Sequence, residues 1–318
     1  MMTAIDRAKQ HSDAKLAALR TRLLGVLPAG EIILTCGSYA RREASEASDI
    51  DFFIITQQPD PLGQPADSAS DQSVKLARDA ISEIVPVEPA EDGAFSQVEA
   101  RDAMLRNIGG TNDSNHKITR RMLILLEGEW LFNAGGLKEV RCEILERYIG
   151  DGMTDHQLAL FLLNDIIRYY RTIAVDYEFK TSEGDRPKPW GIRNIKLVFS
   201  RKLLYASGLF SVAMTADRAR DQKIALLERL FDMPVIDRMI DICGRPNTEA
   251  VLASYNHFLE RFESADVRRR LKELSRQERG DALFRELKNE GHNFTRELLK
   301  LFEATFDSTH PIRRAVVF

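Results

Sequence analysis

Two aspartates, Asp49 and Asp51, alternate with apolar residues at the start of a run of β-branched and aromatic side chains. In an extended chain, residues two apart project from the same face, so the two carboxylates point together while Ile50 and Phe52 point to the opposite face. Two like charges that lie close together are costly unless a cation lies between them, and hard oxygen ligands favour Mg²⁺ or Mn²⁺. The pair therefore predicts a site for a divalent metal ion.

A glycine followed by a serine, Gly37 and Ser38, precedes the aspartates. The segment 31–36 has the pattern of a buried strand that ends at Gly37, and we expect Ser38 to cap a short helix that runs to about residue 44. Glycine allows close approach to the backbone, the first turn of a helix offers unpaired N–H groups, and the serine hydroxyl adds a donor. This turn is predicted to bind the phosphates of a nucleotide, facing the metal ion.

The complete string over residues 37–51 reads Gly-Ser-x-Ala-Arg-x-Glu-Ala-Ser-x-x-Ser-Asp-Ile-Asp. It resembles the signature of the DNA polymerase β-like nucleotidyltransferase superfamily, in particular its minimal nucleotidyltransferase and PII-uridylyltransferase-like branches. The resemblance covers about residues 32–55. It implies a metal-dependent enzyme that uses Mg²⁺ or Mn²⁺ to transfer a nucleoside monophosphate from a nucleoside triphosphate, such as ATP, to an acceptor hydroxyl, with release of pyrophosphate.

The motif leaves the acceptor open. Members of the superfamily modify proteins, RNA ends such as those of tRNA, and small molecules, and the uridylyltransferase-like branch favours a protein hydroxyl. The alternative is a non-catalytic nucleotide-binding or antitoxin-like interaction protein on the same fold, and the structural alternative is a solvated edge strand after a turn. The intact pair of Asp49 and Asp51 favours the enzyme.

The superfamily usually adds a third carboxylate from a neighbouring strand. Residues 84–89 alternate in the manner of a third strand, and Glu88 is the residue we predict as the third catalytic and metal-binding carboxylate. Glu91 and Asp92 are the alternatives for this role. A surface acid before a proline is the competing interpretation of Glu88.

A predicted helix over residues 164–180 and the basic segment 188–202 carry polar side chains at i+3 and i+4 spacing. Such side chains in an apolar stretch are costly to bury unless they pair or meet a ligand. In two-domain members of the superfamily, a helix of the second domain typically places basic residues on the β- and γ-phosphates. The candidates for this contact are Arg168, Lys180, Arg193 and Lys196. The alternative is a structural network of ion pairs, for instance Asp165 with Arg168 and Asp176 with Lys180.

Hydrophobic periodicity predicts the elements that position these residues. Helices are expected at 3–26, 74–84 and 117–132, strands at 31–36 and 49–56, and further helices nearly to the end of the chain. The predicted fold class is α+β, a small mixed-sheet nucleotidyltransferase domain followed by an all-helical domain. We expect the catalytic domain with its N-terminal helix to occupy residues 1–135 and the helical domain residues 136–318.

Composition is typical of a protein with a sizeable core, since 44% of the 318 residues are apolar. The formal charge of -3 gives no overall attraction to nucleic acid, and acidic neighbours offset the basic run 268–272. The three cysteines are far apart in the sequence and predict neither a disulfide framework nor a zinc cluster. No apolar run approaches the ~18 residues that a spanning helix needs. We therefore expect a cytoplasmic protein that does not bind membranes.

Overall fold

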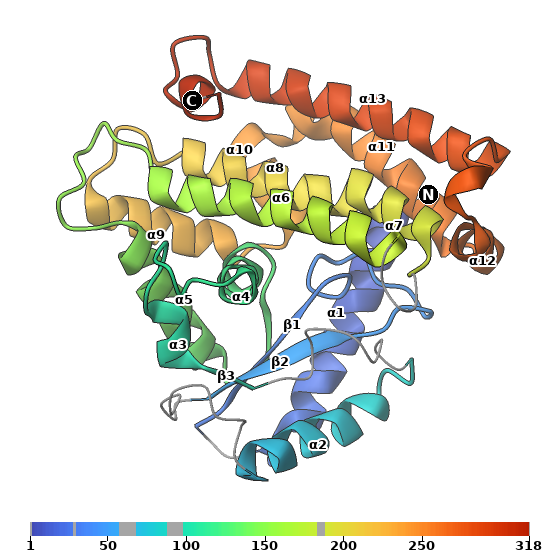
Figure 1. The fold of residues 1–318 in the computed structure, drawn as a ribbon, viewed down its shortest axis with the longest axis horizontal. Coiled ribbons are helices and arrows are strands. Elements are labelled where there is room, and N and C mark those ends of the chain that lie inside the picture. The colour runs from blue at the N-terminus through green and yellow to red at the C-terminus, as the bar shows by residue number, and fades with distance from the viewer. Residues whose placement is uncertain (1, 28–29, 57–67, 88–97, 183–187, 318) are drawn as a thin grey trace. The chain divides into compact units, whose positions relative to one another are not determined.

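The computed structural model describes residues 2–27, 30–56, 68–87, 98–182 and 188–317. The chain forms two compact units (Figure 1). The first, here called the sheet unit, comprises Arg7–Gly152 and Arg220–Pro234. The second, the helical unit, comprises Met1–Asp6, Met153–Ala219 and Val235–Phe318.

Four strands form one mixed sheet in the sheet unit, in the order β3-β2-β1-β4. They are β1 (Ile32–Cys36), β2 (Asp51–Thr56), β3 (Val98–Ala100) and β4 (Glu129–Phe132). β1 pairs antiparallel with both β2 and β4, whereas β3 runs parallel to β2. The two motif strands predicted from the sequence are therefore neighbours at the centre of the sheet.

Helices α1 (Ala4–Leu23) and α2 (Ser68–Ser82) pack on one face of the sheet (Figure 1). Leu16, Leu19 and Leu23 of α1 recur at helical spacing and are fully buried in a cluster with Phe52 and Ile54 of β2. Burial of each such side chain stabilises the fold by about 1.5–3 kcal/mol. This cluster fixes which residues of β2 face α1.

The remaining helices of the sheet unit are α3 (Arg101–Leu105), α4 (Asn115–Leu126), α5 (Ala134–Tyr148) and α9 (Arg220–Phe231). Both α4 and α5 contact β1, and α9 packs against α5. The guanidinium of Arg120, on α4, lies 4.6 Å from the ring centroid of Phe53 in β2. Because Phe53 projects from the opposite face to Phe52, α4 covers the face that α1 leaves open.

The helical unit contains α-helices and two short non-α segments. They are α6 (Leu160–Ser182), α7 (Trp190–Lys196), a π-helix (Leu197–Arg201), α8 (Lys202–Ala213), α10 (Val235–Cys243), α11 (Arg245–Glu263), α12 (Ala265–Glu273), a 3₁₀ turn (Arg276–Glu278), α13 (Ala282–Thr305) and α14 (Ile312–Ala315). Aromatic rings form part of its core: Phe199 stacks on Phe258 at 4.6 Å between centroids and lies tilted against Phe294 at 5.2 Å. The α+β class with a mixed sheet followed by helices is confirmed. Among the described segments, no helix is both long and apolar enough to cross a membrane.

The predicted third strand at 84–89 is wrong over residues 84–87, which follow α2 as a turn and an irregular segment. The amides of Ile84 and Val85 both donate to the carbonyl of Ile81, so the chain continues the last turn of α2. Pro86 has no N–H to offer a neighbouring strand. The strand beside β2 is β3 instead. Glu88 and the alternatives Glu91 and Asp92 lie outside the described residues.

The predicted helix at 117–132 is also wrong in its second half, because α4 ends at Leu126 and residues 129–132 form β4. The change occurs at Gly128, where a Cβ atom would lie 2.8 Å from the carbonyl oxygen of Ile124 and 3.0 Å from Leu34 Cδ1. The glycine lets the chain turn against α4 and pair with β1. The predicted division after residue 135 falls within the first turn of α5, inside the sheet unit, and as a domain boundary it stays a prediction.

Gly128→Ala should destabilise the protein by about 1–3 kcal/mol, since the added methyl group meets backbone atoms that cannot move aside. The matched control is Gly135→Ala in α5, where a Cβ atom meets nothing within 4 Å. There the substitution should leave stability unchanged or raise it by up to about 1 kcal/mol, because alanine favours the helix. Urea unfolding of both variants measures the difference, and equal effects would contradict the proposed packing.

Candidate active site

Asp51 opens β2 and pairs in register with Cys36, the last residue of β1. Ile50 and Phe52 are each 1% exposed, whereas Asp49 and Asp51 are half-buried. The alternation expected from the sequence is therefore present, with apolar side chains in the core and carboxylates at the end of the strand. Within the described part of the chain, the carboxylate of Asp49 has no hydrogen-bond or ion-pair partner.

Gly37 brings the backbone of the following turn against Asp51. Its φ of +77° lies in the left-handed region that favours glycine, and a Cβ atom there would lie 3.1 Å from Asp51 Oδ2. The hydroxyl of Thr35 donates a 2.7 Å hydrogen bond to the backbone carbonyl of Asp51. The Gly-Ser turn and the second aspartate thus adjoin each other, as the motif requires.

The segment after Gly37 is a turn, so the prediction of a short helix to residue 44 is wrong. The amide of Arg41 donates to the carbonyl of Gly37 at 3.0 Å and that of Glu43 to the carbonyl of Ser38 at 2.8 Å. Arg42 then adopts a φ of +62°, which ends the helical course. After the turn, the amide of Ala44 donates a 3.3 Å hydrogen bond to the hydroxyl of Ser12.

Donors nonetheless remain at the start of this turn. The hydroxyl of Ser38 and the amides of Ser38, Tyr39 and Ala40 donate to no group among the residues that the structure describes. Successive N–H groups in such a turn form a concavity that binds anions without a helix dipole. The turn can therefore bind phosphate oxygens through its backbone and through Ser38.

Arg41 anchors the turn in the protein interior. Its side chain is 5% exposed, and its Nε lies 3.0 Å from a carboxylate oxygen of Glu43. A second ion pair joins Arg41 to Glu127, whose side chain is 0% exposed. A buried charge requires such partners, because its desolvation is otherwise uncompensated.

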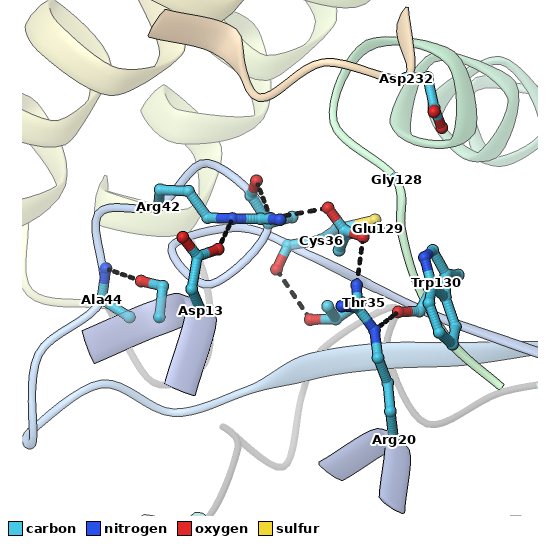
Figure 2. Close-up of polar contacts among 12 residues, drawn as sticks. Asp13, Arg20, Thr35, Cys36, Arg42, Ala44, Gly128, Glu129, Trp130 and Asp232 are labelled. Carbon is cyan, nitrogen blue, oxygen red and sulfur yellow. Dashed lines mark hydrogen bonds and ion pairs between the residues drawn. The ribbon is translucent and has the colours of Figure 1, made fainter. Parts of the chain in front are cut away.

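Arg42 makes a second set of ion pairs that ties the turn to α1 and β4 (Figure 2). Its guanidinium lies 2.7 Å from Asp13 and 2.7 Å from Glu129. Glu129 also accepts from Arg20 at 2.5 Å, and Arg20 lies 3.9 Å over the ring of Trp130. Burial lowers the pKa of Arg20 although Glu129 acts to raise it. These positioning roles were not predicted from the sequence, where the available signal was the two adjacent arginines, Arg41 and Arg42.

Tyr39 connects the turn with the first aspartate. Its side chain is 2% exposed, and burial, assisted by the negative charges of Glu46 and Asp49, raises its pKa to about 12. Its ring lies 6.1 Å from that of His11 between centroids. At neutral pH the phenol is therefore neutral, and its pKa responds to charge at Asp49.

The carboxylate that β3 places beside β2 is Glu99, which pairs in register with Ile55. Ile55 is four residues beyond Asp51, which is about 13 Å along a strand. Glu99 Oε1 lies 2.7 Å from both Arg120 Nε and His116 Nε2. Burial acts to raise the pKa of Glu99, but the contacts with His116 and Arg120 lower it below its usual value. Glu99 is therefore engaged in a structural ion pair.

The position of a third metal ligand stays a prediction at Glu88. Across the described ranges, no group of three or more histidine, cysteine, aspartate or glutamate side chains is placed to hold a metal ion. The predicted ligands Asp49 and Asp51 are described, whereas residues 88–97 are not.

The four basic residues predicted for triphosphate binding lie in the helical unit, and the two aspartates lie in the sheet unit. On α6, Arg168 lies 4.0 Å from Asp165, and Lys180 lies 2.8 Å from Asp176. These are the intrahelical pairs of the alternative interpretation. On α7, Arg193 is half-buried and Lys196 is exposed. Contact of these four side chains with a triphosphate stays a prediction.

Comparison with known families identifies a nucleotidyltransferase domain over residues 20–99. The matched segment extends from the last turn of α1 into β3, and it includes both motif strands, the turn at Gly37 and the two aspartates. The predicted relation to the polymerase β-like nucleotidyltransferase superfamily is confirmed. The sequence has no significant match among curated proteins.

Arg41→Met should destabilise the protein by about 3–5 kcal/mol, because it removes the positive charge that pairs with the buried carboxylate of Glu127. Arg22→Met is the matched control, since the pair of Arg22 with Glu83 is exposed on both sides and should contribute little. Denaturant unfolding at neutral pH compares the two variants. Similar small losses for both would show that the Arg41 ion pairs do not hold the turn.

Tyr39→Phe should remove one source of alkaline destabilisation. The phenol has a pKa of about 12 in the folded state and about 10 in the unfolded chain, so the native state keeps the phenol proton up to a higher pH. The parent should therefore lose up to about 2–3 kcal/mol as pH rises from about 10 to about 12, whereas below pH 10 this contribution is constant. Unfolding free energies at pH 8, 10 and 11 measure the gap between parent and variant. A gap that does not change with pH would contradict this assignment.

Proposed function

We propose that this chain is a metal-dependent nucleotidyltransferase, which moves a nucleoside monophosphate from a nucleoside triphosphate to an acceptor hydroxyl and releases pyrophosphate. The observation that carries the proposal is the close approach of Gly37 to Asp51, where a Cβ atom on the glycine would lie 3.1 Å from the carboxylate oxygen Oδ2. The turn whose donors would bind phosphate therefore begins beside Asp51, within the segment that matches the nucleotidyltransferase domain. A triphosphate with its bound metal ion needs hydrogen-bond donors for the phosphates close to carboxylates for the metal.

The donor set fits Mg²⁺ or Mn²⁺. Asp49 and Asp51, at and just before the start of β2, offer hard carboxylate oxygens, and the carboxylate of Asp49 has no hydrogen-bond or ion-pair partner within the described residues. We propose that these two residues, with Glu88 as the third, hold the ion. When bound, the ion supplies positive charge to the phosphates and to the developing charge at the reacting phosphorus.

The chain's own residues would bind and orient the reactants. Ser38 and the turn amides would donate to the β- and γ-phosphates, and the acceptor oxygen would attack the α-phosphorus in line with the departing pyrophosphate. The P–O bond to pyrophosphate breaks as the new P–O bond forms, and Glu88 is the proposed acceptor of the hydroxyl proton. Catalysis would then depend mainly on positioning and charge neutralisation.

The identity of the acceptor is proposed by class only: a protein hydroxyl, an RNA end or a small molecule. Arg168, Lys180, Arg193 and Lys196 are proposed to contact the triphosphate from the helical unit. A cytoplasmic location is proposed as well, consistent with three cysteines that are all free thiols.

The combined substitution Asp49→Asn and Asp51→Asn should lower nucleotide transfer by at least about 10³-fold, because several kcal/mol of transition-state stabilisation depend on the held ion. Stability should change by no more than about 0.5 kcal/mol, since neither carboxylate is in the core. Asp79→Asn, at an exposed position of α2, is the control and should retain full activity.

The assay supplies each labelled nucleoside triphosphate in turn, with Mg²⁺ or Mn²⁺ and a cell lysate as the source of acceptor, and measures both label transfer and pyrophosphate release. The doubly substituted protein should be inactive with every nucleotide. Transfer at the parent rate by this folded variant would exclude the two aspartates from catalysis.

A further inference from the structure

The outer face of α6 carries an exposed apolar pair, Val175 and Phe179, whose side chains are 70% and 55% exposed. The two residues are one helical turn apart, so their side chains lie next to each other. The opposite face of α6 holds its buried residues and packs against α8 and α7. Polar side chains are expected on the outer face of such a helix. Large apolar side chains that are exposed side by side mark sites of protein contact.

Charged side chains of both signs lie beside this pair. Arg171 is four residues before Val175 and Glu178 is three residues after it, so each lies one turn from Val175 on the same face. Arg171 is exposed and forms no hydrogen bond or ion pair within the residues that the structure describes. Glu178 pairs with Arg276 through Oε2 at 2.6 Å, and its other carboxylate oxygen has no partner in the described part of the chain.

These four residues, Arg171, Val175, Glu178 and Phe179, are here called the α6 stripe. The stripe is basic at its start, apolar at its middle and acidic towards its end. A helix with this order of charges is complementary to a reversed copy of itself. A partner that was only acidic or only basic would match one half of the stripe and be repelled by the other.

The spacing of the charges fits a two-fold arrangement. Residues 171 and 178 are seven apart, almost two full turns, so their side chains project on the same side of Val175. When two antiparallel helices cross with a two-fold axis near Val175, Arg171 of each copy lies opposite Glu178 of the other. The ion pair therefore forms twice, as the symmetry of a closed dimer requires. Val175 then meets Val175 of the second copy at the axis.

We propose that the α6 stripe is a self-association surface, on which α6 of a second copy packs antiparallel about a two-fold axis near Val175. The two symmetric ion pairs set the register, and Val175 and Phe179 supply the apolar contact. One pair of helices buries less than the about 1,600 Å² of a standard interface, so the dimer is expected to be weak. The stripe belongs entirely to the helical unit. Its association therefore does not require the aspartates, the metal ion or the transfer reaction of the proposed function.

Sedimentation of the full chain over a range of concentrations tests the association. The parent should change from monomer to dimer as the concentration rises. Val175→Glu should weaken the dimer at least about tenfold, because it places two like charges at the axis. Leu299→Glu, at a 56% exposed apolar position of α13, is the matched control and should associate as the parent does. A parent that stays monomeric at every concentration would assign the stripe to another partner or to none, and would overturn the proposal.

Exchange of the charges tests the antiparallel register. Arg171→Glu and Glu178→Lys should each weaken the dimer at least about tenfold, because each change sets like charges opposite each other. The protein with both changes should regain the association of the parent, since the ion pairs form again with their signs exchanged. Thermal unfolding of each variant separates this effect from the loss of the pair between Glu178 and Arg276. Failure of the double variant, when folded, to recover association would reject the register.

Oxidative cross-linking locates the axis. A residue next to a two-fold axis lies close to its own copy, so Val175→Cys should join two chains through a disulfide. Leu299→Cys should cross-link no more than the parent, whose three free cysteines give the background. Equal cross-linking at both positions would contradict an axis near Val175.

The protein with Asp49→Asn and Asp51→Asn keeps the association separate from catalysis. It should dimerise as the parent does, whether or not it transfers nucleotides. Loss of the dimer in that protein would connect self-association with the motif and reject the α6 stripe as its cause.

Discussion

The position of the turn after Gly37 depends on ion pairs that the protein buries. Arg41 enters the interior between Glu43 and Glu127, and its neighbour Arg42 reaches Asp13 and Glu129. Because a buried guanidinium must stay with its partners, the two arginines leave the turn little freedom. The backbone of Gly37 is thereby kept against the carboxylate of Asp51. The geometry of the turn thus depends on ion pairs formed within the protein.

The sequence predicted the elements whose pattern is local. The leucines of α1 and the apolar runs of β1 and β2 repeat at the period of their own secondary structure, and all three elements are present. β4 was missed because its four residues fit a helical stripe as well as a strand. The strand expected at 84–87 was misplaced, since alternating valines mark a strand only where an edge is available to pair with. The turn at 37–42 was mistaken for a helix because an arginine such as Arg42 gives no indication in the sequence of the left-handed conformation it adopts.

In the candidate site as well, some features follow from the local sequence and others depend on the folded structure. The nearness of Gly37 and Asp51 could be predicted from the motif, since the two residues lie at the two ends of the connection between the paired strands β1 and β2. The partner of Arg41 could not, because Glu127 lies 86 residues away and only the completed sheet brings it near. The basic side chains on α6 form the intrahelical ion pairs of the alternative interpretation. The i+3 and i+4 spacing is compatible with such pairs and with phosphate contacts alike.

The helix α9 gives the protein an unusual genetic constraint. It belongs to the sheet unit, where it packs against α5 and where Arg141 lies 2.7 Å from Asp232 at its end, yet it is encoded between segments of the helical unit. A recombination event that exchanged everything after residue 152 with a relative would also replace the helix that covers α5. New helical partners could then be acquired only with a matching α9, or with α5 changed to fit. The sheet unit is therefore inherited together with the segments of the helical unit that flank α9 in the sequence.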